Sequence, residues 1–164
     1  MPPWGRKSTK RDAELAKLKT NAKPKILTSV KESVSEVQYQ YRGSCDPIPS
    51  NDVTARLCTA LEAVFVHGLK ETFLGRIFSS RFNEGGAGTP KLPEPSFWTF
   101  ALVFSHKEVI TQIENFSVIS SDVGRSRAWL RSALNDGLLI SYLSAMIADK
   151  VSLAVHYEKF AFLR

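Results

Sequence analysis

Residues 122–136, Asp122-Val-Gly-Arg-Ser-Arg-Ala-Trp-Leu-Arg-Ser-Ala-Leu-Asn-Asp136, form the most informative stretch of this chain. Three arginines and one tryptophan fall within a single short segment that reads as a helix. The sequence around it is apolar and nearly neutral, so these cations need a partner. They either pair with acidic residues of the same domain or bind an acidic partner from outside.

The rest of the chain also favours helices. Apolar residues recur every three or four positions, and no segment alternates as a half-buried strand would. Ser105 and Glu108 have the spacing of a capping box, in which a serine and a glutamate satisfy each other's end amides. We therefore predict an all-α, multi-helix fold. The predicted helices cover residues 24–41, 52 to about 68, 97–104, 108–116, 122–136, 138–148 and 151–160.

Loops separate these helices where glycine and proline gather. Residues 43–51 contain Pro47 and Pro49, and residues 83–95 are richer still in both residue types. The second helix should break near Gly68, although apolar spacing continues beyond it, at Phe73, Leu74, Ile77 and Phe78. The segment 83–95 lacks the lysine and hydroxyl pattern of a phosphate-binding loop, so no nucleotide site is expected there.

The positive charge belongs to the first residues of the chain. The 164 residues carry a net charge of +6, but residues 1–23 hold seven bases against two acids. Residues 24–164 hold 15 bases and 14 acids, a balance that argues against nucleic-acid binding, which needs many phosphate contacts. We expect residues 1–23 to form a solvated, disordered tail. The alternative is that Trp4 and its basic neighbours bind an anionic membrane surface.

No pattern of catalytic residues occurs. His67, His106 and His156 lie far apart, and the chain has neither an HExxH nor a GxSxG motif. Cys45 and Cys58 match no zinc or redox spacing, and as free thiols they suit a cytoplasmic protein. We expect no signal peptide, because the opening residues are charged and polar. We therefore predict no enzymatic activity, no cofactor and no metal.

Three blocks of sequence, taken in order, resemble a RUN domain. They are Leu57-Cys-Thr-Ala-Leu-Glu-Ala-Val-Phe-Val-His-Gly-Leu69, Pro95-Ser-Phe-Trp98 and the arginine segment at 122–135. The resemblance covers residues 24–164. It is closest to the lysosomal adaptors that combine RUN and pleckstrin-homology domains, through Ala133-Leu-Asn-Asp-Gly-Leu138 and the closing Phe160-Ala-Phe-Leu-Arg164.

This resemblance implies a non-catalytic helical module that binds small GTPases. The adaptors that it resembles use their RUN domain to bind the lysosomal Arf-like GTPase in its GTP form, so we expect that type in preference to a Rab. Membrane contact would be indirect, through the GTPase on late endosomes or lysosomes. The implied binding residues are His67, Arg125 and Arg127, with Lys70 and Arg131 as weaker candidates.

The chain departs from the family's pattern in two ways. Lys70 stands where close relatives can carry a second histidine, which leaves the identity of the GTPase open. RUN domains also continue with further helices, so the resemblance implies that this chain holds an incomplete RUN bundle ending at Arg164.

A single regular helix cannot present all three arginines to one partner. On a regular helix Arg125 and Arg127 project about 160° apart, whereas Arg127 and Arg131 are only about 40° apart. Arg125 can join the Arg127 side only if the helix is frayed or bent at its start. Otherwise one arginine pairs within the domain, as its planar fork readily does with a carboxylate.

A structural role for the arginines is the alternative to partner binding. Arg131 could pair with an internal acid such as Glu62 instead of meeting a partner. The domain would then be a helical scaffold or interaction fragment with no GTPase binding. Trp129, Trp98 and Phe97 fit the hydrophobic core better than a binding surface, because each lies in an apolar helix.

Overall fold

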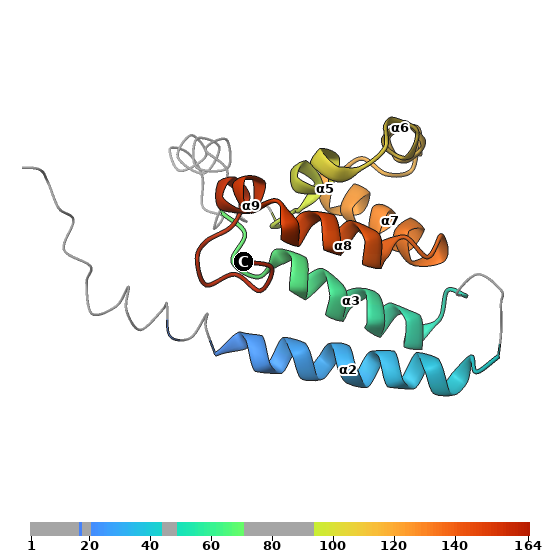
Figure 1. Cartoon of the computed structure of the whole chain (residues 1–164). Helices are drawn as coiled ribbons and strands as arrows, with labels where there is room; N and C mark the ends of the chain where they lie inside the picture. The colour runs from blue at the N-terminus through green and yellow to red at the C-terminus, as the bar shows by residue number, and fades with distance from the viewer. Residues whose placement is uncertain (1–16, 18–20, 44–48, 71–93) are drawn as a thin grey trace, which may run out of the picture.

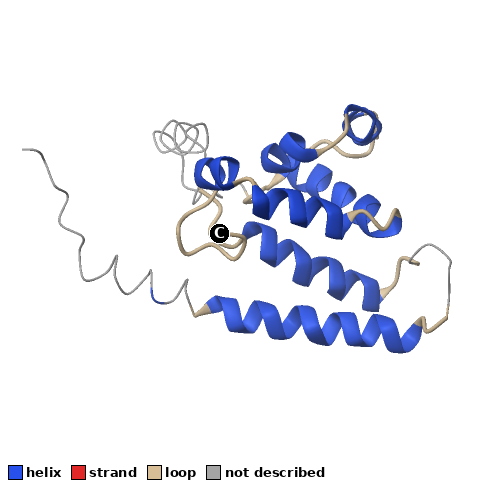
Figure 2. Ribbon diagram, in the orientation of Figure 1, coloured by secondary structure: helices blue, strands red, loops and turns tan. Residues whose placement is uncertain are grey.

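The structure of this chain is a computed structural model. It describes residues 17, 21–43, 49–70 and 94–164. Within them it contains seven helices, one isolated bridge between Leu69 and Tyr157, and no strand (Figure 2). The all-α prediction is confirmed. The helices are α2 (Ala22–Gln40), α3 (Asp52–Val66), α5 (Trp98–Phe104), α6 (Lys107–Glu114), α7 (Asp122–Asn135), α8 (Leu139–Ala148) and α9 (Lys150–His156).

Helix α7, the arginine segment, lies at the centre of this arrangement. It packs against α3, α5, α6 and α8, whereas α2 packs along the far side of α3 at the edge of the molecule (Figure 1). Within the part of the chain described here, no single helix is long and apolar enough to cross a membrane. Helices α8 and α9 pass that test of length and composition together, but they are bent by 89° where they meet.

The core is built around Trp129, which is fully buried on α7. Its ring meets the ring of Phe65 edge-on at 5.7 Å and that of Phe97 at 6.0 Å, and those two phenylalanines stack on each other at 4.6 Å. Such ring geometries add to the free energy of burial itself. The predicted core positions of Trp129, Phe97 and Trp98 are confirmed.

Ser105 does not begin a helix as its capping-box spacing suggested. Helix α6 starts after His106 and has no side-chain cap, so that prediction is wrong. The Ser105 hydroxyl instead accepts a hydrogen bond of 2.7 Å from the Trp129 indole and donates one of 2.7 Å to the Ala101 carbonyl. A buried indole N–H needs an acceptor, and Ser105 supplies it across two helices.

The last helix is shorter than predicted. It ends at His156 instead of near Phe160, because Tyr157 forms the bridge to Leu69 and the chain then turns back. The Tyr157 hydroxyl donates a 2.7 Å hydrogen bond to the Phe65 carbonyl at the end of α3. The segment 157–164 thus closes over the exit of α3, with Ala161 and Leu163 buried.

Gly68 makes this closure possible, and it ends α3 as predicted. Its φ is +76°, and a Cβ built on it would lie 2.6 Å from the Cα of Ala161. Only glycine provides both the left-handed conformation and the space. Gly137 and Asp149 mark the predicted breaks on either side of α8, the first with a φ of +67° and the second by capping α9.

Some predictions lie outside the described residues. They are the continued apolar pattern at Phe73–Phe78, most of the glycine- and proline-rich loop 83–95, the middle of the loop 43–51, and nearly all of the basic tail. Helix α2 begins at Ala22, two residues before the proline that was expected to open it.

Candidate functional site

Helix α7 is regular from its first residue. The Ser121 side chain accepts a hydrogen bond from the Gly124 amide, and the Arg125 amide donates to the Ser121 carbonyl. This N-cap satisfies end amides that otherwise lack partners. The bent start that would bring Arg125 to the Arg127 side is not seen, so the two arginines project to different sides of the helix.

Arg125 pairs with its own helix. Its Nη1 lies 2.7 Å from the Asp122 carboxylate, one turn earlier, and about a quarter of its side chain (27%) is exposed. Its Nε is buried and has no hydrogen-bond partner among the described residues. Arg125 is therefore only partly available to a protein that approaches from outside.

Arg127 reaches across to α3. Its Nε lies 2.9 Å and 3.1 Å from the two carboxylate oxygens of Glu62, and the hydrogen bond to Glu62 raises the pKa of the guanidinium. The arginine side chain is 58% exposed and that of Glu62 is 21% exposed. The two terminal nitrogens of Arg127 have no hydrogen-bond partner in the described part of the chain, so the charged end of this side chain faces solvent.

Arg131 meets a thiol instead of an acid. Its Nη1 lies 3.6 Å from the Sγ of Cys58, and the side chain is half-buried. The suggested pairing of Arg131 with Glu62 is wrong, because Arg127 holds that carboxylate. Two arginines one turn apart on α7 therefore face two residues one turn apart on α3, in antiparallel order.

His67 and Lys70 lie away from the three arginines, just after the C-terminal end of α3. His67 follows the last helical residue, and its ring packs edge-on against the ring of Phe160 at 5.8 Å. The Lys70 amine donates a 2.5 Å hydrogen bond to the carbonyl of Ala154, near the end of α9, where a positive charge is favoured. Lys70 thus helps to hold the exit of α3 against α9.

The candidate residues therefore form two groups. The three arginines line α7 and contact α3 or their own helix, whereas His67 and Lys70 pack against the C-terminal segment and α9. Among the described residues, no group of three His, Cys, Asp or Glu side chains is placed to hold a metal ion.

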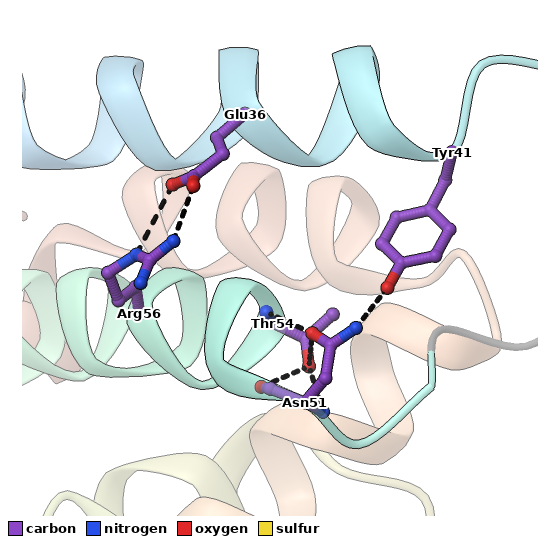
Figure 3. A network of polar contacts seen from close by, with 5 residues as sticks. All are labelled: Glu36, Tyr41, Asn51, Thr54 and Arg56. Atoms are coloured by element: carbon purple, nitrogen blue, oxygen red, sulfur yellow. Dashed lines mark hydrogen bonds and ion pairs between the residues drawn. The ribbon is translucent and has the colours of Figure 1, made fainter.

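A polar network that was not predicted from the sequence joins the start of α3 to α2 (Figure 3). Asn51 and Thr54 cap each other at the start of α3, and the Asn51 amide also donates to the Tyr41 hydroxyl. Arg56 forms an ion pair with Glu36 of α2. The signal for the cap was present, since an asparagine followed three residues later by a hydroxyl fits an N-cap.

Residues 56–164 match the sequence profile described as the RUN domain, a span that includes every candidate residue on α3 and α7. The chain belongs to the RUN domain family.

Two curated relatives of this chain are proteins named pleckstrin homology domain-containing family M member 2. The human protein is 29% identical over 141 residues, covering 84% of this chain and 12% of the relative. The mouse protein is 30% identical over 125 residues, covering 74% of this chain and 10% of the relative. The chain thus spans about a tenth of the length of these relatives.

Proposed function

We propose that this chain is a non-catalytic effector module that binds the GTP form of a small GTPase. The module would belong to an adaptor of late endosomes or lysosomes that acts in vesicle tethering, fusion, autophagy or organelle positioning. RUN domains generally bind small GTPases, and the relatedness to pleckstrin homology domain-containing proteins supports the adaptor context. A lysosomal Arf-like GTPase is favoured over a Rab.

The exposed guanidinium of Arg127 is the observation that carries this proposal. Glu62 anchors it through Nε, and more than half of the arginine side chain is exposed. A guanidinium fork of this kind can bind a carboxylate through two parallel hydrogen bonds. We expect it to contact acidic residues near the switch surface of the GTPase, where complementary charge speeds association and sets orientation.

The other candidates would have smaller roles. Arg125 would contribute only by turning its partly exposed end away from Asp122, and Arg131 only through the nitrogens that do not contact Cys58. His67 and Lys70 would extend the contact along the exit of α3. Because both already pack against the C-terminal half of the domain, their loss should affect folding as well as binding.

A binding assay with GTP- and GDP-locked Arf-like and Rab GTPases tests the proposal. We expect binding to the GTP form, and at least a tenfold loss in the variant carrying both Arg125→Ala and Arg127→Ala. Arg56→Ala is the matched control, since Arg56 is a similarly exposed arginine that is paired with an acid on the other side of α3. Equal binding to both nucleotide forms, or unchanged binding by the double variant, would refute the proposal.

One observation favours a second candidate, a helical scaffold with structural arginines. All three arginines have an intramolecular contact, with Asp122, Glu62 or Cys58. Under this alternative, reversing the charges of Arg125 and Arg127 should unfold the domain. Circular dichroism separates the two candidates, because retained helix with lost GTPase binding supports the effector module, and loss of helix supports the scaffold.

A further inference from the structure

Helix α2 is attached to the rest of the described structure mainly through one neighbour. It packs along α3 and makes no comparable contact with any other described helix (Figure 1). The aromatic core around Trp129 lies on the other side of α3, among residues of α3, α5 and α7. The loss of α2 would therefore leave that core in place.

The contact between α2 and α3 runs along both helices, but it buries few side chains of α2 completely. The one buried residue of α2 is a serine, Ser33. Four apolar residues that face α3 are only partly buried: Ile26, Val30, Val34 and Val37. Complete burial of such a side chain contributes about 1.5–3 kcal/mol, so partial burial of these four stabilises the helix less than an equal number of core residues would.

Polar contacts hold only one end of α2. Glu36 forms the ion pair with Arg56, and the Tyr41 hydroxyl accepts from the Asn51 amide; we call these two contacts the clasp (Figure 3). Residues 22–35, by contrast, make no described side-chain hydrogen bond or ion pair to α3. The N-cap residue Asn21 also forms no side-chain cap.

The clasp fixes the register of the two helices. Tyr41 lies five residues after Glu36, and its partner Asn51 lies five residues before Arg56, so the helices run antiparallel in a single register. In that register Ser33 comes level with residue 59, next in sequence to Ala60, which is also buried. Two small side chains at this level let the helices approach closely, and a larger or charged group there would force them apart.

We propose that α2 is a hinged helix, which opens from its N-terminal end while the clasp keeps its C-terminal end on α3. Opening would uncover the stripe of α3 that continues from Arg56 through Ala60 and Val64, one and two turns further along. Elements held by few buried apolar contacts open at a lower free energy than the global fold. This property is independent of any GTPase contact.

Hydrogen exchange of the whole chain, followed by mass spectrometry, tests the hinge. We expect the amides of residues 26–34 to exchange about tenfold or more faster than those of the α3 and α7 interiors, with residues 37–40 in between. A clasp variant, Glu36→Gln with Tyr41→Phe, should raise exchange at residues 37–40 to the rate of residues 26–34. Exchange in α5 and α7 should not change.

A charge at the helix contact provides the second arm of the test. Ser33→Asp should release α2 and leave α3 to α9 protected, whereas Ser35→Asp, which places the same charge on an exposed position of the same helix, should change nothing. Equal exchange of α2 and α3 in the unmodified chain would overturn the hinge. So would a clasp variant that exchanges like the unmodified chain, or a Ser33→Asp variant in which all helices lose protection together.

Discussion

Arg127 and Glu62 are joined side-on, with the Nε of Arg127 within 3.1 Å of both carboxylate oxygens. This ion pair links α7 to α3 and also fixes how the guanidinium is displayed. An acid that bound the terminal nitrogens would compete with a partner for them, whereas a contact at Nε leaves them free. Under the proposed function, the same residue would serve both packing between helices and recognition by a partner.

The first prediction concerns the stability of this pair. Arg127→Ala should lower the free energy of unfolding by less than about 1 kcal/mol, because solvent screens an exposed ion pair and its net contribution is small. Urea denaturation of the variant and the parent chain measures the difference. The effect should shrink further in high salt. A loss above about 2 kcal/mol would instead support a structural role for the arginine.

The second prediction concerns Ser105, whose hydroxyl accepts from the buried indole of Trp129. Ser105→Ala should cost about 1–3 kcal/mol, because it leaves a buried N–H without its acceptor. Ser117→Ala, at an exposed position, is the control and should be nearly neutral. Thermal unfolding followed through tryptophan fluorescence reports both. Equal stability of the two variants would mean that the indole finds another acceptor.

The helices and the core could be predicted from the sequence, because both depend on local spacing. The periodic apolar residues of α7 place Trp129 inward whatever its partners are. The partner of Glu62 could not be predicted. Arg127 and Arg131 are one turn apart on nearly the same stripe, so the axial register of α7 on α3 decides which of them meets the acid.

Two other predictions from the sequence, the capping box at Ser105 and the end of the last helix, are wrong because of contacts between distant segments. The spacing of Ser105 and Glu108 fits a capping box, yet the serine hydroxyl meets an indole 24 residues away. The last helix has apolar spacing as far as Phe160, yet it stops at His156 because Tyr157 pairs with Leu69. Local propensity is overridden in each case by a contact between distant segments.

The third prediction separates backbone strain from crowding at two glycines. Gly68 and Gly137 both have a positive φ, but a Cβ at Gly68 would lie 2.6 Å from Ala161, and a Cβ at Gly137 would meet nothing within 4 Å. Gly137→Ala should cost about 1 kcal/mol through its backbone alone, and Gly68→Ala distinctly more. Chemical denaturation of both variants gives the comparison. Equal losses would show that segment 157–164 moves aside easily.

The fourth prediction concerns Tyr157, whose hydroxyl donates to the Phe65 carbonyl within the core. Burial raises the pKa of this phenol, because the charged phenolate is poorly solvated there. Its contribution to stability is therefore complete below the unfolded pKa of about 10 and decreases as the pH rises above that value. Denaturation measured between pH 8 and pH 11 should show this loss in the parent chain.

The Tyr157→Phe variant should be less stable at pH 8 but should lack this part of the decline in stability. The control variant Tyr39→Phe, at an exposed tyrosine, should retain it. A parent chain and a Tyr157→Phe variant with the same slope would assign the alkaline loss to other groups.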